Sequence, residues 1–174
     1  AEQLSPGFFM YADADTAMFR ILEFVGSDVE SLSEMTMWLV HSETWAALDE
    51  LEERFAAVIE DNPMLAYTLA YARSKQGQTE RAEALVDKAR KMNPGNYKAH
   101  YDVAALLHER GWIDWAKGEY QTIIDHEPRN DDYLNYVIVS HRWLAEFDHD
   151  AGKELAASKK MDLTNELLEE LAKK

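Results

Sequence analysis

Apolar residues recur every three or four positions through most of the chain, which is the spacing of helices with one buried face. The pattern itself repeats, because equivalent residues return after 34 positions along the middle of the sequence. The pairs at this distance are Leu69 and Val103, Ala70 and Ala104, Gly77 and Gly111, Ala82 and Ala116, and Pro94 and Pro128. Glycine permits a tight turn and proline cannot continue a helix, so each unit is predicted to be helix, turn, helix and link.

Three such units are predicted, and the third is weaker than the first two: 63–96, 97–130 and 131–163. The second helix of the third unit fits the pattern through Ala151 and Leu155 only after a one-residue insertion. We expect residues 164–174 to form a separate capping helix, with Thr164 as its N-cap. Terminal repeats need such covers because each repeat otherwise buries its faces on its neighbours.

Residues 1–62 are predicted to form an N-terminal helical region that contains a hairpin divergent from the repeat. Ser27 or Asp28 is the expected N-cap of the first helix of that hairpin, and another helix ending at Phe24 precedes it. The hairpin lacks the turn glycine, and its second helix, about 44–61, is longer than a repeat helix.

The residues that carry the period resemble the tetratricopeptide repeat (TPR) family, whose 34-residue unit alternates large and small residues at fixed offsets. In the first clear repeat these residues are Ala66, Leu69, Ala70, Ala82, Val86, Ala89 and Pro94, and in the next His100, Val103, Ala104, Leu107, Ala116, Tyr120 and Pro128. The resemblance implies an all-α fold: a TPR-type α-solenoid of antiparallel helix hairpins with an N-terminal helical extension and a C-terminal capping helix.

The charge of the chain narrows the class of partner. Its 33 acidic and 18 basic side chains give a formal charge of −15, which repels phosphate backbones and disfavours nucleic acid. The simpler interpretation is that this charge keeps the protein soluble. The alternative is that it attracts a basic or amphipathic polypeptide partner. There is no cysteine, which excludes thiolate chemistry. No apolar run approaches the roughly 20 residues that span a bilayer, so membrane insertion is not expected.

Candidate chemistry is sparse. No His-Glu-x-x-His pattern, Gly-rich phosphate loop or nucleophile elbow occurs. The best local metal candidate, Asp148-His149-Asp150, falls where a solvated turn is expected. We therefore predict no catalytic residue, no metal and no cofactor, and we rank a metal-dependent enzyme as the least favoured function.

The TPR resemblance implies a concave groove, lined by the first helix of each repeat, in which peptides bind. The residues carried to that groove are Tyr67, Tyr71, Lys75, Lys98, Tyr101, His108, Asn135, Val139 and Arg142. Tyrosine suits such a surface because it buries a large area and keeps a polar group. The alternative interpretation is that the tyrosines cover the edges of the core. Asp102 and Asp132 stand where domains that clamp acidic chaperone tails carry amide or basic groups, which disfavours that ligand.

The predicted function is therefore a protein–protein interaction scaffold that binds a peptide or partner segment. The alternative is a secretion or assembly chaperone that holds an export substrate, since small acidic TPR chaperones are similar in size and dimerise through N-terminal helices. The apolar segments 8–11 and 18–25 are expected to cap the first hairpin. The alternatives are a homodimer contact through the N-terminal helices, or a segment that folds into the groove as a self-ligand. A cytoplasmic location is expected, with an exported or periplasmic mature form as the alternative.

Overall fold

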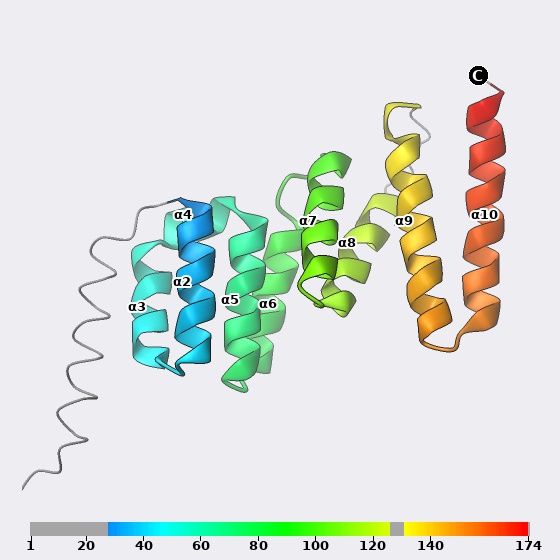
Figure 1. Cartoon of the computed structure of the whole chain (residues 1–174). Coiled ribbons are helices and arrows are strands. Elements are labelled where there is room, and N and C mark those ends of the chain that lie inside the picture. Colours follow the sequence, from blue (N-terminus) through cyan, green and yellow to red (C-terminus); the bar gives the residue numbers. More distant parts are fainter. Residues whose placement is uncertain (1–27, 126–130, 174) are drawn as a thin grey trace, which may run out of the picture. The chain divides into compact units, whose positions relative to one another are not determined.

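The computed structural model describes residues 28–125 and 131–173, and every regular element within them is a helix (Figure 1). The helices are α2 (Val29–His41), α3 (Trp45–Arg54), α4 (Ala56–Asp61), α5 (Pro63–Lys75), α6 (Thr79–Arg90), α7 (Tyr97–Glu109), α8 (Ile113–Asp125), α9 (Asp131–Asp150) and α10 (Glu154–Ala172). The predicted helix that ends at Phe24, and the cap or dimer contact expected of it, lie outside the described residues.

The chain divides between Met92 and Asn93 into two compact units. In the first unit α5 contacts α2, α4 and α6, and in the second unit α9 contacts α7, α8 and α10. Each unit therefore consists of helical hairpins whose members pack on one another. The predicted all-α, TPR-type fold class is confirmed.

The period found in the sequence sets where the helices begin. The first helices of the hairpins begin at Val29, Pro63, Tyr97 and Asp131, which are 34 residues apart. The second helices begin at Trp45, Thr79 and Ile113, again 34 apart, and then at Glu154. The hairpin that looked divergent in sequence thus keeps the same period as the two clear repeats.

Equivalent turns use equivalent backbone conformations. Gly77 and Gly111 close the turns of two hairpins with φ of +75° and +74°. The equivalent residue of the first hairpin is Glu43, which adopts φ of +55° although it carries a side chain. Positive φ is unfavourable for residues with a Cβ atom, so this turn forms at a local cost in energy.

Side chains of three residues cap the first helices at their N-termini. The Asp28, Asn62 and Asn96 side chains each accept a hydrogen bond from the backbone N–H three residues ahead, at 2.9, 3.0 and 3.0 Å. The same bond lowers the pKa of Asp28. The cap predicted at Asp28 is confirmed. Such a cap typically stabilises a helix by about 1 kcal/mol.

The long helix predicted for about 44–61 is interrupted. Phe55 lies between α3 and α4 with φ of −107° and ψ of 20°, outside the helical region. Its side chain is almost fully buried. The sequence pattern alone indicated a continuous helix, and the break shows that packing of this aromatic ring accompanies a local departure from helical geometry.

The small residues of the period lie in the cores of the two units. Ala66, Ala70 and Ala89 are at most 1% exposed in the first unit, and Ala104 and Ala116 are fully buried in the second. Small side chains let paired helices approach closely, and larger neighbours such as leucine then fill the remaining space. Burying each leucine contributes roughly 1.5–3 kcal/mol.

The last hairpin is longer than a standard repeat. α9 has 20 residues against 13 in α5, and α10 has 19 against 12 in α6, so each is seven residues longer. Gly152, with φ of +72°, closes the turn. Seven residues make nearly two helical turns, so the extension preserves which face of each helix is buried.

Three sequence-based expectations for this hairpin are wrong. Ala151 lies in the turn and Leu155 is 72% exposed, so the one-residue insertion misplaced the second helix. Thr164 is not an N-cap: it is buried within the continuous helix α10, and its hydroxyl donates to the Lys160 carbonyl at 2.8 Å. The expected boundary at 163–164 therefore falls inside a helix, and no separate capping helix begins there.

Candidate functional site

The predicted groove residues of the first unit differ in accessibility. Tyr67 is fully buried, so its side chain belongs to the core of this unit. The groove position predicted for Tyr67 is therefore wrong, and the alternative interpretation, in which the tyrosines belong to the core, applies to this residue. Tyr71 is half-buried, and the Lys75 ammonium lies 5.1 Å from the centre of its ring. That cation–π contact orients the lysine stem along the helix.

In the second unit the structure brings predicted residues into contact with aromatic rings of the next hairpin. The ring of Tyr101, on α7, lies 5.5 Å from that of Tyr136, on α9. Seven residues further along each helix, about two turns, the His108 ring meets that of Trp143 edge-on at 4.6 Å. All four side chains are half-buried. Two aromatic pairs therefore bridge the neighbouring helices α7 and α9.

We call this surface the α7–α9 face. It consists of Lys98, Tyr101, His108, Asn135, Tyr136, Val139, Arg142 and Trp143. Tilted and edge-on ring pairs are favourable because the positive ring edge meets the negative ring face, and each contributes about 0.5–1.5 kcal/mol beyond burial. The pairs thus hold a partly exposed aromatic surface in a fixed arrangement.

Polar side chains accompany the aromatic rings on this face. Lys98 forms an ion pair with Asp102 at 2.5 Å, and that carboxylate raises the pKa of the lysine. The pair is exposed, so it adds little stability. Asn135 and Arg142 are also exposed, and neither forms a hydrogen bond or ion pair with another described side chain. Their donors and the amide oxygen of Asn135 are accessible to a ligand.

Buried contacts behind the face fix the position of α7. His100 Nδ1 lies 2.6 Å from Glu119 Oε2, and this buried pair joins α7 to α8. Tyr120, fully buried, packs its ring 6.1 Å from Tyr101, and burial strongly raises the pKa of its hydroxyl. These contacts place Tyr101 against a well-packed support.

The metal candidate of the sequence forms pairs with α10 instead of one converging site. His149 Nδ1 lies 3.1 Å from Glu154 Oε2, which raises the pKa of His149. Asp148 accepts a hydrogen bond from Lys160, which lowers the pKa of that carboxyl. No three metal-ligating side chains converge among the described residues. Within the same residues, no helix combines the length and apolar character needed to cross a bilayer.

Comparison with known proteins places the repeats in a family. Residues 73–135 match the family model described as tetratricopeptide repeat. Residues 73–135 therefore carry tetratricopeptide repeat sequence. Two crystal structures of MamA are similar to it: one at 17% identity over 99% of this chain and 100% of that chain, with a TM-score of 0.43, and another at 19% identity over 92% and 84%, with a TM-score of 0.42. No curated protein matches the sequence.

TPR repeats are protein-interaction modules, typically without catalytic activity of their own. The matched repeats accordingly support a role as a protein-interaction scaffold with protein partners. The matched segment contains α6, α7 and α8 and reaches the start of α9. It therefore includes Tyr101 and His108 from the α7–α9 face.

Sequence reasoning missed two members of this TPR surface. The 34-residue period pairs Tyr101 with Asn135 and His108 with Arg142, whereas the rings in contact belong to the next residues, Tyr136 and Trp143. A period identifies equivalent positions, but side chains on adjacent helices meet at offset positions. The signal in the sequence was an aromatic residue directly after two of the three predicted groove residues of α9, Asn135 and Arg142 but not Val139.

Proposed function

We propose that the protein binds a polypeptide segment of its partner on the α7–α9 face. The observation that carries this proposal is the pair of half-buried aromatic contacts, Tyr101 with Tyr136 and His108 with Trp143. Rigid aromatic rings are frequent energetic centres of protein interfaces because they bury much area and lose little conformational freedom.

The polar members of the face supply orientation. Asn135 has both a donor and an acceptor, which suits it to bond a peptide backbone. Arg142 is suited to a carboxylate or a carbonyl group, because its guanidinium presents several donors in one plane. Lys98 is already paired with Asp102, so its contribution to binding is smaller. The proposed ligand is thus a peptide with apolar side chains and an accessible backbone.

Peptide display on the intact protein tests the proposal. The counter-screen uses the double variant Tyr101→Ala/Asn135→Ala, and the control uses Glu80→Ala/Glu83→Ala, two exposed residues of α6. Thermal melts of all proteins verify folding. Peptides selected by the wild type and the control but lost on the double variant support the α7–α9 face. Equal retention on the double variant, or no selected peptide at all, rejects it.

A further inference from the structure

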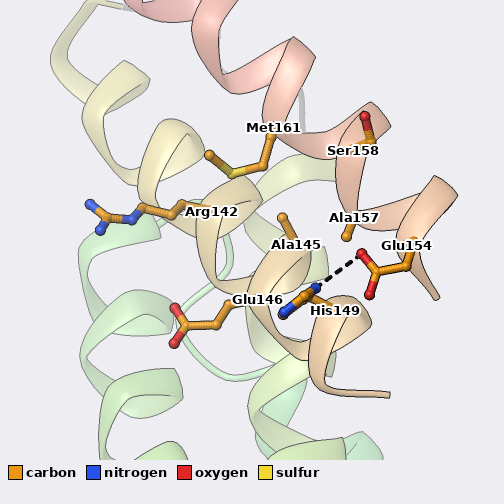
Figure 2. A pocket seen from close by; sticks show the side chains of 8 residues that line it. All are labelled: Arg142, Ala145, Glu146, His149, Glu154, Ala157, Ser158 and Met161. Carbon is orange, nitrogen blue, oxygen red and sulfur yellow. Dashed lines mark hydrogen bonds and ion pairs between the residues drawn. The ribbon is translucent and has the colours of Figure 1, made fainter. Parts of the chain in front are cut away.

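A second surface lies in the last hairpin, where a pocket of about 340 Å³ opens between α9 and α10 (Figure 2). Each helix lines it with residues at i, i+3, i+4 and i+7: Arg142, Ala145, Glu146 and His149 from α9, and Glu154, Ala157, Ser158 and Met161 from α10. A set of four residues with this spacing is the hole that accepts a side chain of a facing helix. We call this surface the α9–α10 groove.

The side chains of the groove leave room for another helix. Figure 2 shows Ala145 and Ala157 between the two helices, while Arg142 extends away from α10 and Met161 reaches towards α9. The two alanines form a floor that gives a neighbouring backbone room to approach. The contact between His149 and Glu154 closes one end.

The apolar surface continues along α10 beyond the pocket. Met161 is 40% exposed and Leu168 is 46% exposed. They are seven residues apart, so both lie on the same side of the helix. The apolar stripe is therefore longer than the pocket and spans two further turns, which suits an extended helical ligand better than a single side chain.

The groove exists because the hairpin is extended. Helices of standard repeat length would end seven residues earlier in α9 and begin seven residues later in α10. Six of the eight lining residues, all except Arg142 and Met161, belong to these added turns. The extension thus supplies a surface that the other hairpins do not have at this position.

The charged residues beside the α9–α10 groove indicate which kind of ligand helix would bind there. On α10 the exposed residues beside the stripe are Glu154, Ser158, Asn165 and Glu169, which include two carboxylates and no basic group. The α9 rim is mixed, with Arg142, Glu146 and His149. A ligand with lysine or arginine towards α10 would meet complementary charge, and the formal charge of −15 would accelerate its approach.

We propose that the α9–α10 groove docks an amphipathic α-helix of a partner polypeptide, with apolar residues on the face that enters the groove and basic residues on the flank that meets α10. The mode of binding is that of a helix in a groove, where apolar residues at i, i+3/i+4 and i+7 anchor the ligand. The groove shares Arg142 with the α7–α9 face, but its other seven lining residues lie outside that face.

A pair of synthetic helical peptides tests the proposal. One carries an alanine and leucine face flanked by lysines, and the other replaces every lysine by glutamate. Fluorescence anisotropy measures their binding to the full chain and to Ser158→Trp, which places a bulky ring in the groove from an exposed position. The matched control is Lys159→Trp, because Lys159 is also exposed but points to another side of α10.

The expected result is that the lysine peptide binds the wild type at least about tenfold more tightly than the glutamate peptide. Ser158→Trp should weaken it by about tenfold or more, whereas Lys159→Trp should leave binding unchanged. The double variant Glu154→Lys/Glu169→Lys should reverse the preference between the peptides. Reversal by this variant separates charge recognition from adhesion of any apolar helix.

Several outcomes would overturn the proposal. Equal affinity for both peptides, no binding of either, or equal loss in Ser158→Trp and Lys159→Trp would each exclude a basic helix as the ligand of this groove. Sedimentation velocity of the protein alone tests whether a second copy of the chain occupies the groove. A dimer that Ser158→Trp dissociates would assign the groove to self-association instead.

Discussion

The buried guanidinium of Arg73 offers the sharpest test of how the first unit is held together. Its side chain is fully buried, and its Nε donates to Glu52 Oε2 at 3.0 Å while Nη2 contacts the same oxygen. Nη1 contacts Asp49 at 2.6 Å and Gln76 at 2.8 Å. Replacing Glu52 by leucine should therefore destabilise this unit much more than replacing Arg73 itself.

The two magnitudes follow from what each change leaves behind. Glu52→Leu removes three charge-assisted hydrogen bonds, two from Arg73 and one from the exposed Arg81. It leaves the buried cation of Arg73 with Asp49, which is 61% exposed, and Gln76. Breaking a buried ion pair costs about 3–5 kcal/mol, and the remaining partners place this case near about 3 kcal/mol. Arg73→Leu removes the cation together with its desolvation cost, so we expect a change within about 1 kcal/mol.

The repeat itself supports the small effect of Arg73→Leu. Leu39 and Leu107 occupy the equivalent position in α2 and α7, and both are fully buried. A leucine side chain therefore suits this position in two other hairpins of the same chain. The carboxylates that Arg73 contacts are partly exposed, so water can solvate them after the exchange.

Urea unfolding, with hydrogen exchange to locate the affected unit, measures both variants and the double variant. Glu60→Leu is the control, because Glu60 pairs with Lys88 at the surface, with 63% and 44% of the side chains exposed. In the double variant most of the loss caused by Glu52→Leu should disappear. If Arg73→Leu costs as much as Glu52→Leu or more, the unpaired buried charge is not the cause of the destabilisation.

Three further predictions concern single positions. Glu43→Gly should raise the urea midpoint by an amount equivalent to about 1 kcal/mol, because it relieves positive φ. His141→Leu should raise stability by roughly 1–3 kcal/mol, since it removes a buried Nδ1 without a described partner. Burial, and then the charge of Lys160, lower the pKa of His141. The folded protein therefore keeps its full stability above about pH 6.5 and loses part of it as pH falls through the folded-state pKa of His141. Melting curves against pH should accordingly be flatter in acid for His141→Leu. NMR titration should show that Glu154→Gln lowers the pKa of His149 towards its ordinary value.

The sequence predicted most of the fold because the information is local and repeated. Small residues such as Ala70 and Ala104 recur at one period, and they are buried as that period requires. The turn glycines Gly77 and Gly111 marked hairpin ends directly, since positive φ favours glycine. Asp28 was predictable as a cap because its side chain satisfies a backbone N–H of the first turn.

The wrong predictions share one cause, which is that the same residue type or spacing occurs in two different structural contexts. Threonine caps helices, but inside a helix its hydroxyl also bonds the carbonyl four residues back, as Thr164 does to Lys160. Leu155 looked like a core residue by spacing, yet it lies at the exposed start of α10. The Glu43 turn was hidden because a residue other than glycine adopts positive φ.

The candidate site was only partly predictable because accessibility depends on neighbouring helices. Tyr67 and Tyr101 are equivalent by period, yet Tyr67 is fully buried and Tyr101 is half-buried. α5 contacts α2, α4 and α6, which cover most of its surface. The exposure of a repeat position therefore depends on which elements pack beside it, and no pattern within one helix reports that.

The extension of the last hairpin connects the repeat to a new surface. An insertion that is not close to a whole number of turns would rotate the following side chains away from the buried face, whereas about seven residues complete two turns. With seven, Ala157 and Thr164 remain buried on one side of α10, while Met161 and Leu168 remain partly exposed on another. The added turns therefore keep the core contact of the hairpin and lengthen its outer groove at the same time. Deleting seven residues from each helix, 144–150 and 154–160, should accordingly preserve the helical fold measured by circular dichroism but abolish binding of the lysine peptide. Retained binding would show that the groove lies elsewhere than in the added turns.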